Sequence, residues 1–303
     1  MKYIRLFVRL IRPLFILTSV LLYLLGVSIA HYLSGQINWS AFIFGLIWIL
    51  LVMVGTQCLN EFFDPGLGIE NSVVKHTPFS GVTGAIGKDK LPRPAAFWVG
   101  MTCYAITASL SVLILQNSNL NQPVVFLLGV IILGELLFAL PPVRLVTSGY
   151  GELVMSIINA GLVPAIAYLM QGNDFHRLLA MIAFPLTVLY LSMLLALEFP
   201  DYASDIKQAK RSMLIRIGWQ RGMLVHNALI LISYALFAIA FLLGLPFIVG
   251  WPIIFAIPVG LYQILIMIRI ADGAKPNWNL LILVSISTFG LAAYILTFAF
   301  WTH

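Results

Sequence analysis

The sequence is poor in charged residues. Asp, Glu, Lys and Arg make up only 9% of its 303 residues, against about 25% in soluble domains. Apolar residues make up 61%, so the composition predicts an integral membrane protein. The 17 basic residues outnumber the 11 acidic ones and give a formal net charge of +6. Because basic residues of membrane proteins collect on cytoplasmic loops, we expect no nucleic-acid partner.

Cysteine is equally scarce, and the common catalytic motifs are missing from the sequence. Cys58 and Cys103 both lie in apolar stretches and cannot supply a disulfide framework or a zinc site, so we expect buried small side chains. The glycine-containing stretch 81–88 departs from a Walker motif at Val82 and Asp89, which excludes a P-loop NTPase. No nucleophile elbow is present, so acyl transfer has no support.

Long stretches without any charged residue predict the membrane spans. Three such stretches exceed 40 residues, and a spanning helix needs about 20, so each of the three holds two helices. Three shorter stretches hold one helix each. The expected all-α bundle therefore has nine transmembrane helices, at about 13–33, 39–63, 94–115, 122–140, 151–171, 177–198, 218–243, 250–270 and 278–300.

The basic residues predict the orientation of this bundle. With nine spans, 16 of the 17 fall on one side and Arg177 alone on the other, and the positive-inside rule places the richer side in the cytoplasm. We expect a cytoplasmic N-terminus, an external C-terminus, and one domain over 1–303 in the cell membrane. The long polar connections at about 64–93 and 199–217 both lie on the cytoplasmic side, where we expect the active site.

Acidic residues gather in two short windows at cytoplasmic helix ends. In the first window, Gln57, Asn60 and Asp64 share one helix face, with Glu61 beside them and Glu70 further along the chain. The second window contains Glu198, Asp201 and Asp205. The last two are one helical turn apart, so their carboxylates can point at a common place.

Carboxylates near a low-dielectric membrane are costly, at up to about 2.5–3.5 kcal/mol for one charge at a helix centre. A cation would offset this cost, and ligands that are all oxygen atoms indicate Mg²⁺. Magnesium usually shares its ligands with substrate phosphates, which implies a diphosphate substrate. Lys75, Arg144 and Lys210 lie near the two windows and can meet the remaining phosphate oxygens. The spacing alone does not distinguish this metal site from an alternative in which the acidic side chains only solvate the helix ends and pair with nearby lysines.

The two windows resemble the two aspartate-rich motifs of the UbiA superfamily of intramembrane prenyltransferases. The first motif, NDxxDxxxD, corresponds to 60–68, with Glu61 at its second position and Gly68 at its last. Its continuation Gly68-x-Glu70 is similar to the naphthoate-type branch. The second motif, DxxxD, corresponds to Asp201 and Asp205.

Other elements of the superfamily lie between and around these motifs. Pro141-Pro142-x-Arg144 resembles a family element that follows the fourth span, and Glu152 closes a Gly-x-Gly-Glu sequence. Glu198 departs from the family, in which Asn is common at this position. The resemblance covers most of the chain.

The resemblance implies an Mg²⁺-dependent transfer of an isoprenyl group from a prenyl diphosphate, through an allylic cation, to an aromatic or other lipophilic acceptor. A naphthoate-like quinone precursor is the preferred acceptor. A polytopic transporter with a cation or proton site and a non-catalytic membrane scaffold remain alternatives. The implied catalytic residues are Asn60, Asp64, Asp201 and Asp205; the implied metal ligands are these four with Glu61 and Glu70; and the implied substrate contacts are Lys75, Arg144, Glu198 and Lys210.

Overall fold

The computed structural model describes residues 2–64, 83–87, 89–117, 122–172, 174–207 and 210–303. Within these ranges nine helices are long and apolar enough to cross a membrane, which confirms the predicted all-α, nine-helix class. The helices are α1 Lys2–Leu10, α2 Pro13–Ser34, α3 Trp39–Phe62, α4 Arg93–Asn117, α5 Gln122–Ala139, α6 Gly151–Ser156, α7 Val163–Leu169, α8 Arg177–Glu198, α9 Tyr202–Lys207, α10 Met213–Ile217, α11 Trp219–Leu242, α12 Phe247–Gly250, α13 Ile257–Ala271 and α14 Trp278–Thr302.

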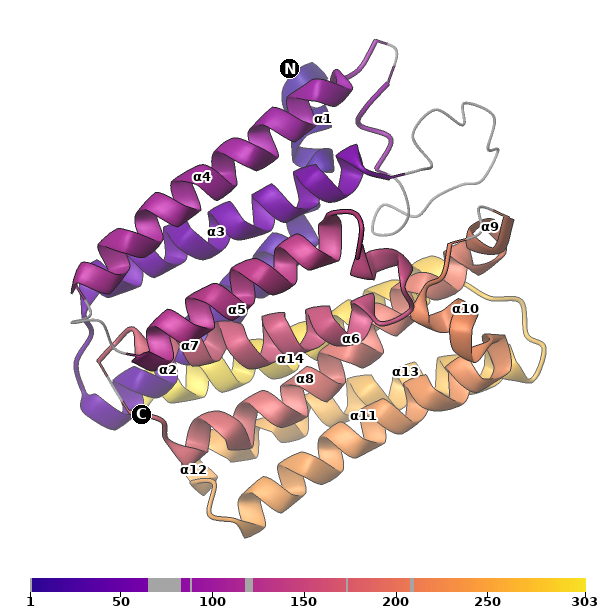
Figure 1. Cartoon of the computed structure of the whole chain (residues 1–303). Coiled ribbons are helices and arrows are strands. Elements are labelled where there is room, and N and C mark those ends of the chain that lie inside the picture. The colour runs from indigo at the N-terminus through magenta and orange to yellow at the C-terminus, as the bar shows by residue number, and fades with distance from the viewer. Residues whose placement is uncertain (1, 65–82, 88, 118–121, 173, 208–209) are drawn as a thin grey trace.

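The long helices run side by side as one bundle (Figure 1). The N-terminal helix α1 and the short helices α9 and α10 lie at one end of the bundle, and the C-terminus and α12 lie at the other. The termini are therefore at opposite ends, as an odd number of spans requires. Which end faces the cytoplasm stays a prediction.

Large apolar side chains cover the outer surface of the bundle. Leu224 and Leu242 on α11 are 70% and 87% exposed, and Trp98 on α4 is 66% exposed. Such exposure is costly in water, at about 25 cal/mol per Å² of apolar surface, but not in lipid. The exposed apolar surface and the nine apolar helices are those of an integral, multi-pass membrane protein.

Helix α8 is the most enclosed of the spanning helices, and it has the bounds predicted for the sixth span, 177–198. The sequence did not predict that the chain continues from Glu198 through a 3₁₀ turn, Phe199–Asp201, into α9. Pro200 lies in this turn and has no N–H to donate to an α-helical ladder. The helical path thus carries both aspartates of the second acidic window on one rod.

A proline also shapes the fifth span. Residues 157–162, between α6 and α7, form a π-helix. Pro164 lies in the first turn of α7, where a missing N–H is tolerated. Beside Pro164, Gly26 lets α2 approach α7 closely, because a Cβ at Gly26 would lie only 2.2 Å from the Pro164 carbonyl oxygen. Small residues allow such close backbone contact in membrane bundles.

Candidate active site

A cavity of about 160 Å³ lies between the end of α3 and the junction of α8 and α9. Its apolar wall contains Phe15, Phe138, Val146, Met155, Leu194 and Leu197. Its polar wall contains Arg12, Gln57, Asn60, Asp64, Glu152, Tyr190, Glu198, Asp201, Asp205, Lys210 and Ser212. Segments that are distant in sequence therefore meet in one space.

The first acidic window supplies one side of the cavity. Asn60 and Asp64 are only 5% and 8% exposed, and with Gln57 they line the cavity from the end of α3. The Asn60 Oδ1 and Gln57 Oε1 atoms have no hydrogen-bond partner among the described residues. Since a buried, unpaired oxygen costs about 1–3 kcal/mol, these two acceptors are suited to a ligand that donates or is positively charged.

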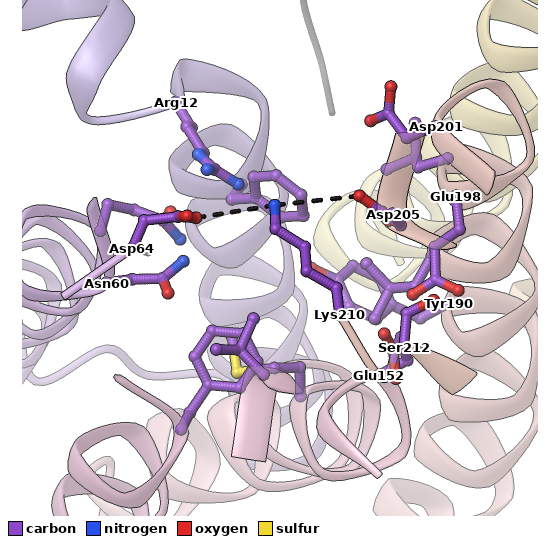
Figure 2. A pocket seen from close by; sticks show the side chains of 17 residues that line it. Arg12, Asn60, Asp64, Glu152, Tyr190, Glu198, Asp201, Asp205, Lys210 and Ser212 are labelled. Atoms are coloured by element: carbon purple, nitrogen blue, oxygen red, sulfur yellow. Dashed lines mark ion pairs between the residues drawn. The ribbon is translucent and has the colours of Figure 1, made fainter. Parts of the chain in front are cut away.

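The second acidic window faces the first, and Lys210 lies between them (Figure 2). The Lys210 ammonium Nζ is 3.8 Å from Asp64 Oδ2 and 3.8 Å from Asp205 Oδ1. Asp201 is 3% exposed and also lines the cavity. The predicted meeting of Asn60, Asp64, Asp201 and Asp205 is thus present in the structure.

The cavity carries a marked excess of negative charge. Five carboxyl groups line it, against two cationic side chains, Arg12 and Lys210. Carboxylates in a site of low dielectric repel one another strongly. The wall is therefore electrostatically complementary to cations or to the donor groups of a ligand.

Glu198, the last residue of α8, also lines the cavity. Its Oε2 atom accepts a hydrogen bond from the Leu214 backbone N–H at 3.0 Å. Glu152 and Ser212 line the cavity next to Glu198 (Figure 2). Figure 2 shows these groups with Tyr190 on one side of the cavity, opposite Asn60 and Asp64.

Glu61 does not line the cavity among the described residues. Its carboxylate accepts hydrogen bonds from the Thr83 backbone N–H at 3.1 Å and from the Thr83 hydroxyl group, and it lies 3.5 Å from the Arg12 guanidinium. Both carboxylate oxygens are thus in contact with Thr83 or Arg12, and the expectation that Glu61 is a metal ligand stays a prediction.

Three further candidates lie elsewhere. Arg144 precedes a short 3₁₀ turn, Leu145–Thr147, and does not line the cavity as the structure describes it. Burial lowers the pKa of Arg144, and the negative charge of Asp64 partly offsets this effect. Glu70 and Lys75 lie outside the described residues.

The acidic residue Glu135 lies outside both acidic windows of the sequence. It is fully buried within α5, next to Thr56, and it is not among the side chains that line the described cavity.

The sequence reasoning did not identify Arg12 and Tyr190 as site residues. Arg12 is one of the basic residues that determine the predicted topology, and it directly precedes Pro13, the first residue of α2. Tyr190 lies two helical turns before Glu198 on α8. That spacing, at i and i+8, places both on one helix face and was the signal that could have identified Tyr190.

Comparison with known proteins agrees with this architecture. The sequence model of the UbiA prenyltransferase family matches residues 19–286. A 1,4-dihydroxy-2-naphthoate octaprenyltransferase of Bacillus subtilis is 23% identical over 238 residues, which cover 77% of this chain and 70% of that protein. A 2-carboxy-1,4-naphthoquinone phytyltransferase of Synechocystis sp. is 24% identical over 232 residues, which cover 77% of this chain and 72% of that protein.

Solved structures show the same fold. A UbiA homolog from Archaeoglobus fulgidus bound to GPP and Mg²⁺ superposes with a TM-score of 0.67 at 18% identity. The superposition covers 98% of this chain and 100% of that one.

Proposed function

Because the chain belongs to the UbiA prenyltransferase family, we propose that it transfers an isoprenyl group from a prenyl diphosphate to an aromatic acceptor in quinone biosynthesis. Membership in this family identifies an enzyme that transfers alkyl groups, and it displaces the transporter and scaffold alternatives. The observation that carries the proposal is the cavity in which Asp64 faces Asp201 and Asp205. The two relatives named for naphthoate and naphthoquinone substrates support a quinone precursor as the acceptor.

The donor set of this cavity fits Mg²⁺. All of its candidate ligands are oxygen atoms, of Asn60, Asp64, Asp201 and Asp205, and hard oxygen donors suit this ion. Within the described part of the chain, no three acidic, His or Cys side chains are close enough to form a metal cage by themselves. This agrees with Mg²⁺, which takes several ligands from water and substrate phosphates. Glu70 remains a proposed additional ligand.

Two cationic side chains are placed to bind the diphosphate. Lys210 lies between the two acidic windows, and Arg12 enters the cavity from the start of α2 (Figure 2). Both can form charge-assisted hydrogen bonds with phosphate oxygens. Arg144 and Lys75 are proposed as further contacts of the diphosphate. Arg144 lies close enough to Asp64 to interact with its charge.

The chemistry follows from these positions. Bound Mg²⁺ would withdraw charge from the leaving diphosphate and so promote ionisation of the prenyl carbon–oxygen bond. Arg12 and Lys210 would orient the diphosphate and balance its charge. Phe15, Phe138 and Tyr190 line the same cavity, where their rings would exclude water and offer π faces to an allylic cation.

We further propose that 1–303 forms one domain in the cell membrane, with the cavity on the cytoplasmic side. The acidic end of the bundle also carries α1, which contains Lys2, Arg5 and Arg9. Basic residues at this end support a cytoplasmic location by the positive-inside rule. The inner connections at about 64–93 and 199–217 would then flank the active site.

A radiometric assay tests the function. The purified protein, in detergent or lipid, is given radiolabelled prenyl diphosphate, Mg²⁺ and a panel of aromatic acceptors, and the lipid products are separated. We expect an Mg²⁺-dependent prenylated product, lost in Asp64→Asn and kept in Asp272→Asn, a control at an exposed acid after α13. Transfer that persists without divalent cations, or transfer to none of the acceptors, would refute the proposal.

A further inference from the structure

One face of the N-terminal helix α1 attaches it to the bundle. Leu10 is 1% exposed, and with Phe7 it packs against Ala85 and Ala96. The first of these partners lies shortly before α4 and the second lies in its first turn. Figure 1 shows α1 at the same end of the bundle as the start of α4. The helix is therefore held in a fixed place beside this segment.

The rest of α1 is exposed and divides into an apolar face and a basic face. Ile4 and Val8 lie one helical turn apart and are 68% and 45% exposed. Lys2, Arg5 and Arg9 are exposed too, and their i, i+3, i+7 spacing places them on a second face. An apolar face beside a basic one is typical of a helix that lies in the interface of a bilayer.

The connection to α2 places α1 at the level of the lipid head groups. Arg12 has a positive φ of 50°, a left-handed conformation that does not continue an α-helix. Pro13 follows as the first residue of α2, which is the first of the candidate spans. The chain therefore enters the bilayer directly after α1, and α1 lies at its surface, where the lipid phosphates are.

Two basic side chains from distant parts of the sequence converge beside Gly84. A Cβ atom at Gly84 would lie 3.8 Å from Arg9 Nη2 and 3.9 Å from Lys90 Nζ. Gly84 has a positive φ of 64°, a conformation that favours glycine, and without a side chain it leaves the place between the two cations open. Both basic side chains are exposed, so a ligand can reach them.

Neither of these cations has an acidic partner in the part of the chain that the structure describes. The ion pairs found there join Arg12 or Lys210 to acids of the two acidic windows. Asp89, the sequence neighbour of Lys90, forms no ion pair with Lys90 or Arg9. Like charges held near one point repel each other, and an anion bound between them would replace this repulsion by attraction.

From this geometry we propose that Arg9 and Lys90 bind the phosphate group of an anionic membrane lipid. The Arg9 guanidinium can bind two phosphate oxygens and the Lys90 ammonium a third, while Ile4 and Val8 on α1 would contact the acyl chains. An anionic lipid fits better than a zwitterionic one, because its head group brings no cation of its own to this basic place. Neither Arg9 nor Lys90 lines the described cavity, so the lipid site is separate from the candidate active site.

Lipid binding is measured directly on the purified protein in a neutral detergent. The protein is titrated with phosphatidylglycerol, with phosphatidylcholine and with soluble glycerol 3-phosphate, and the unfolding temperature and the bound lipids, counted by native mass spectrometry, are recorded. The same titrations are made with the double variant Arg9→Gln/Lys90→Gln. The matched control, Arg221→Gln/Lys275→Gln, removes two exposed basic side chains elsewhere on the molecule.

We expect phosphatidylglycerol to raise the unfolding temperature of the wild type and the control by about 5 °C at about 100 times its Kd. The double variant should lose at least about half of this shift and bind phosphatidylglycerol about 10-fold more weakly, the scale of a lost charge-assisted contact. Ile4→Gln/Val8→Gln should weaken the same binding without removing a charge, because contact with the acyl chains is lost. The single variants Arg9→Gln and Lys90→Gln should lie between the wild type and the double variant.

Three results would overturn the proposal. Equal stabilisation of the double variant and the control by phosphatidylglycerol would show that Arg9 and Lys90 do not bind the lipid. An equal shift with phosphatidylcholine would show that the charge of the head group is not recognised. An equal shift with glycerol 3-phosphate would identify a site for free anions instead of a lipid. None of these measurements uses prenyl transfer, so their outcome is independent of the proposed function.

Discussion

From the sequence, Glu61 could be a metal ligand or a structural hydrogen-bond acceptor. The contacts of its carboxylate favour the structural role. The carboxylate holds residue Thr83 by two hydrogen bonds and lies 3.5 Å from Arg12, and the Glu61 side chain is 1% exposed. It therefore joins the end of α3 to the start of α2 and to the segment 83–87. We expect replacement of Glu61 to reduce stability first and activity only as a consequence.

The magnitude follows from the contacts. Glu61→Asp shortens the side chain by one methylene, so the carboxylate can no longer reach both Thr83 and Arg12. Hydrogen bonds to a charged group contribute about 1.5–3 kcal/mol each, so loss of one or two of them costs about 1.5–6 kcal/mol. For a chain of this size the melting temperature in detergent should fall by about 3–12 °C, on the scale of about 2 °C per kcal/mol.

The assay measures stability and Mg²⁺ dependence on the same preparations. Thermal unfolding is followed in detergent for wild type, Glu61→Asp and Thr83→Val, and the Mg²⁺ concentration for half-maximal transfer is determined for each. We expect both variants to unfold at lower temperature with an Mg²⁺ requirement near that of wild type. A Glu61→Asp protein of normal stability with a changed Mg²⁺ requirement would show that Glu61 is a metal ligand after all.

Four further predictions concern other parts of the chain. Asp205→Asn should fold with near wild-type yield but lose about 100-fold or more of its transfer activity, and normal specific activity with poor yield would favour a structural role. Gly26→Ala should lower the unfolding temperature, since its Cβ would meet the Pro164 oxygen at 2.2 Å at a cost of about 1–3 kcal/mol; an unaltered melting curve would contradict the packing. A tag at His303 should react with impermeant reagents from outside intact cells, and labelling from the cytoplasm alone would invert the topology. Arg144→Lys should raise the KM for prenyl diphosphate if the guanidinium binds phosphate, and unaltered kinetics for both substrates would remove it from the site.

Much of the fold could be predicted from the sequence because a bilayer imposes simple rules. Apolar length alone gave nine spans, and the structure has nine candidate spans in its described ranges. The acidic windows were also found in this way, since rare charges next to apolar runs indicate a site. The sixth span was predicted at 177–198, and α8 has these bounds. Its continuation through a 3₁₀ turn at Pro200 into α9 was not predicted, because proline normally suggests the end of a helix.

The finer arrangement of the site could not be read from spacing. Glu61 and Asp64 lie on the same helix end, yet one is bonded to Thr83 and the other faces Lys210. Which of the two turns inward depends on where a distant segment supplies N–H and O–H donors. In the same way, Glu152 of α6 and Glu198 of α8 line one cavity, and no local sequence pattern predicts that these two residues meet.

The continuous helical segment formed by α8, its 3₁₀ turn and α9 limits which insertions and deletions the sequence can tolerate. Tyr190, Glu198 and Asp201 are placed on one path of helical turns, so their directions depend on the number of residues between them. An insertion or deletion of one residue there would rotate every later side chain by about 100° and turn the carboxylates away from the cavity. Point substitutions in this segment leave the register intact. We therefore expect substitutions at the lipid-facing positions of this segment to be tolerated, and changes in its length to be excluded.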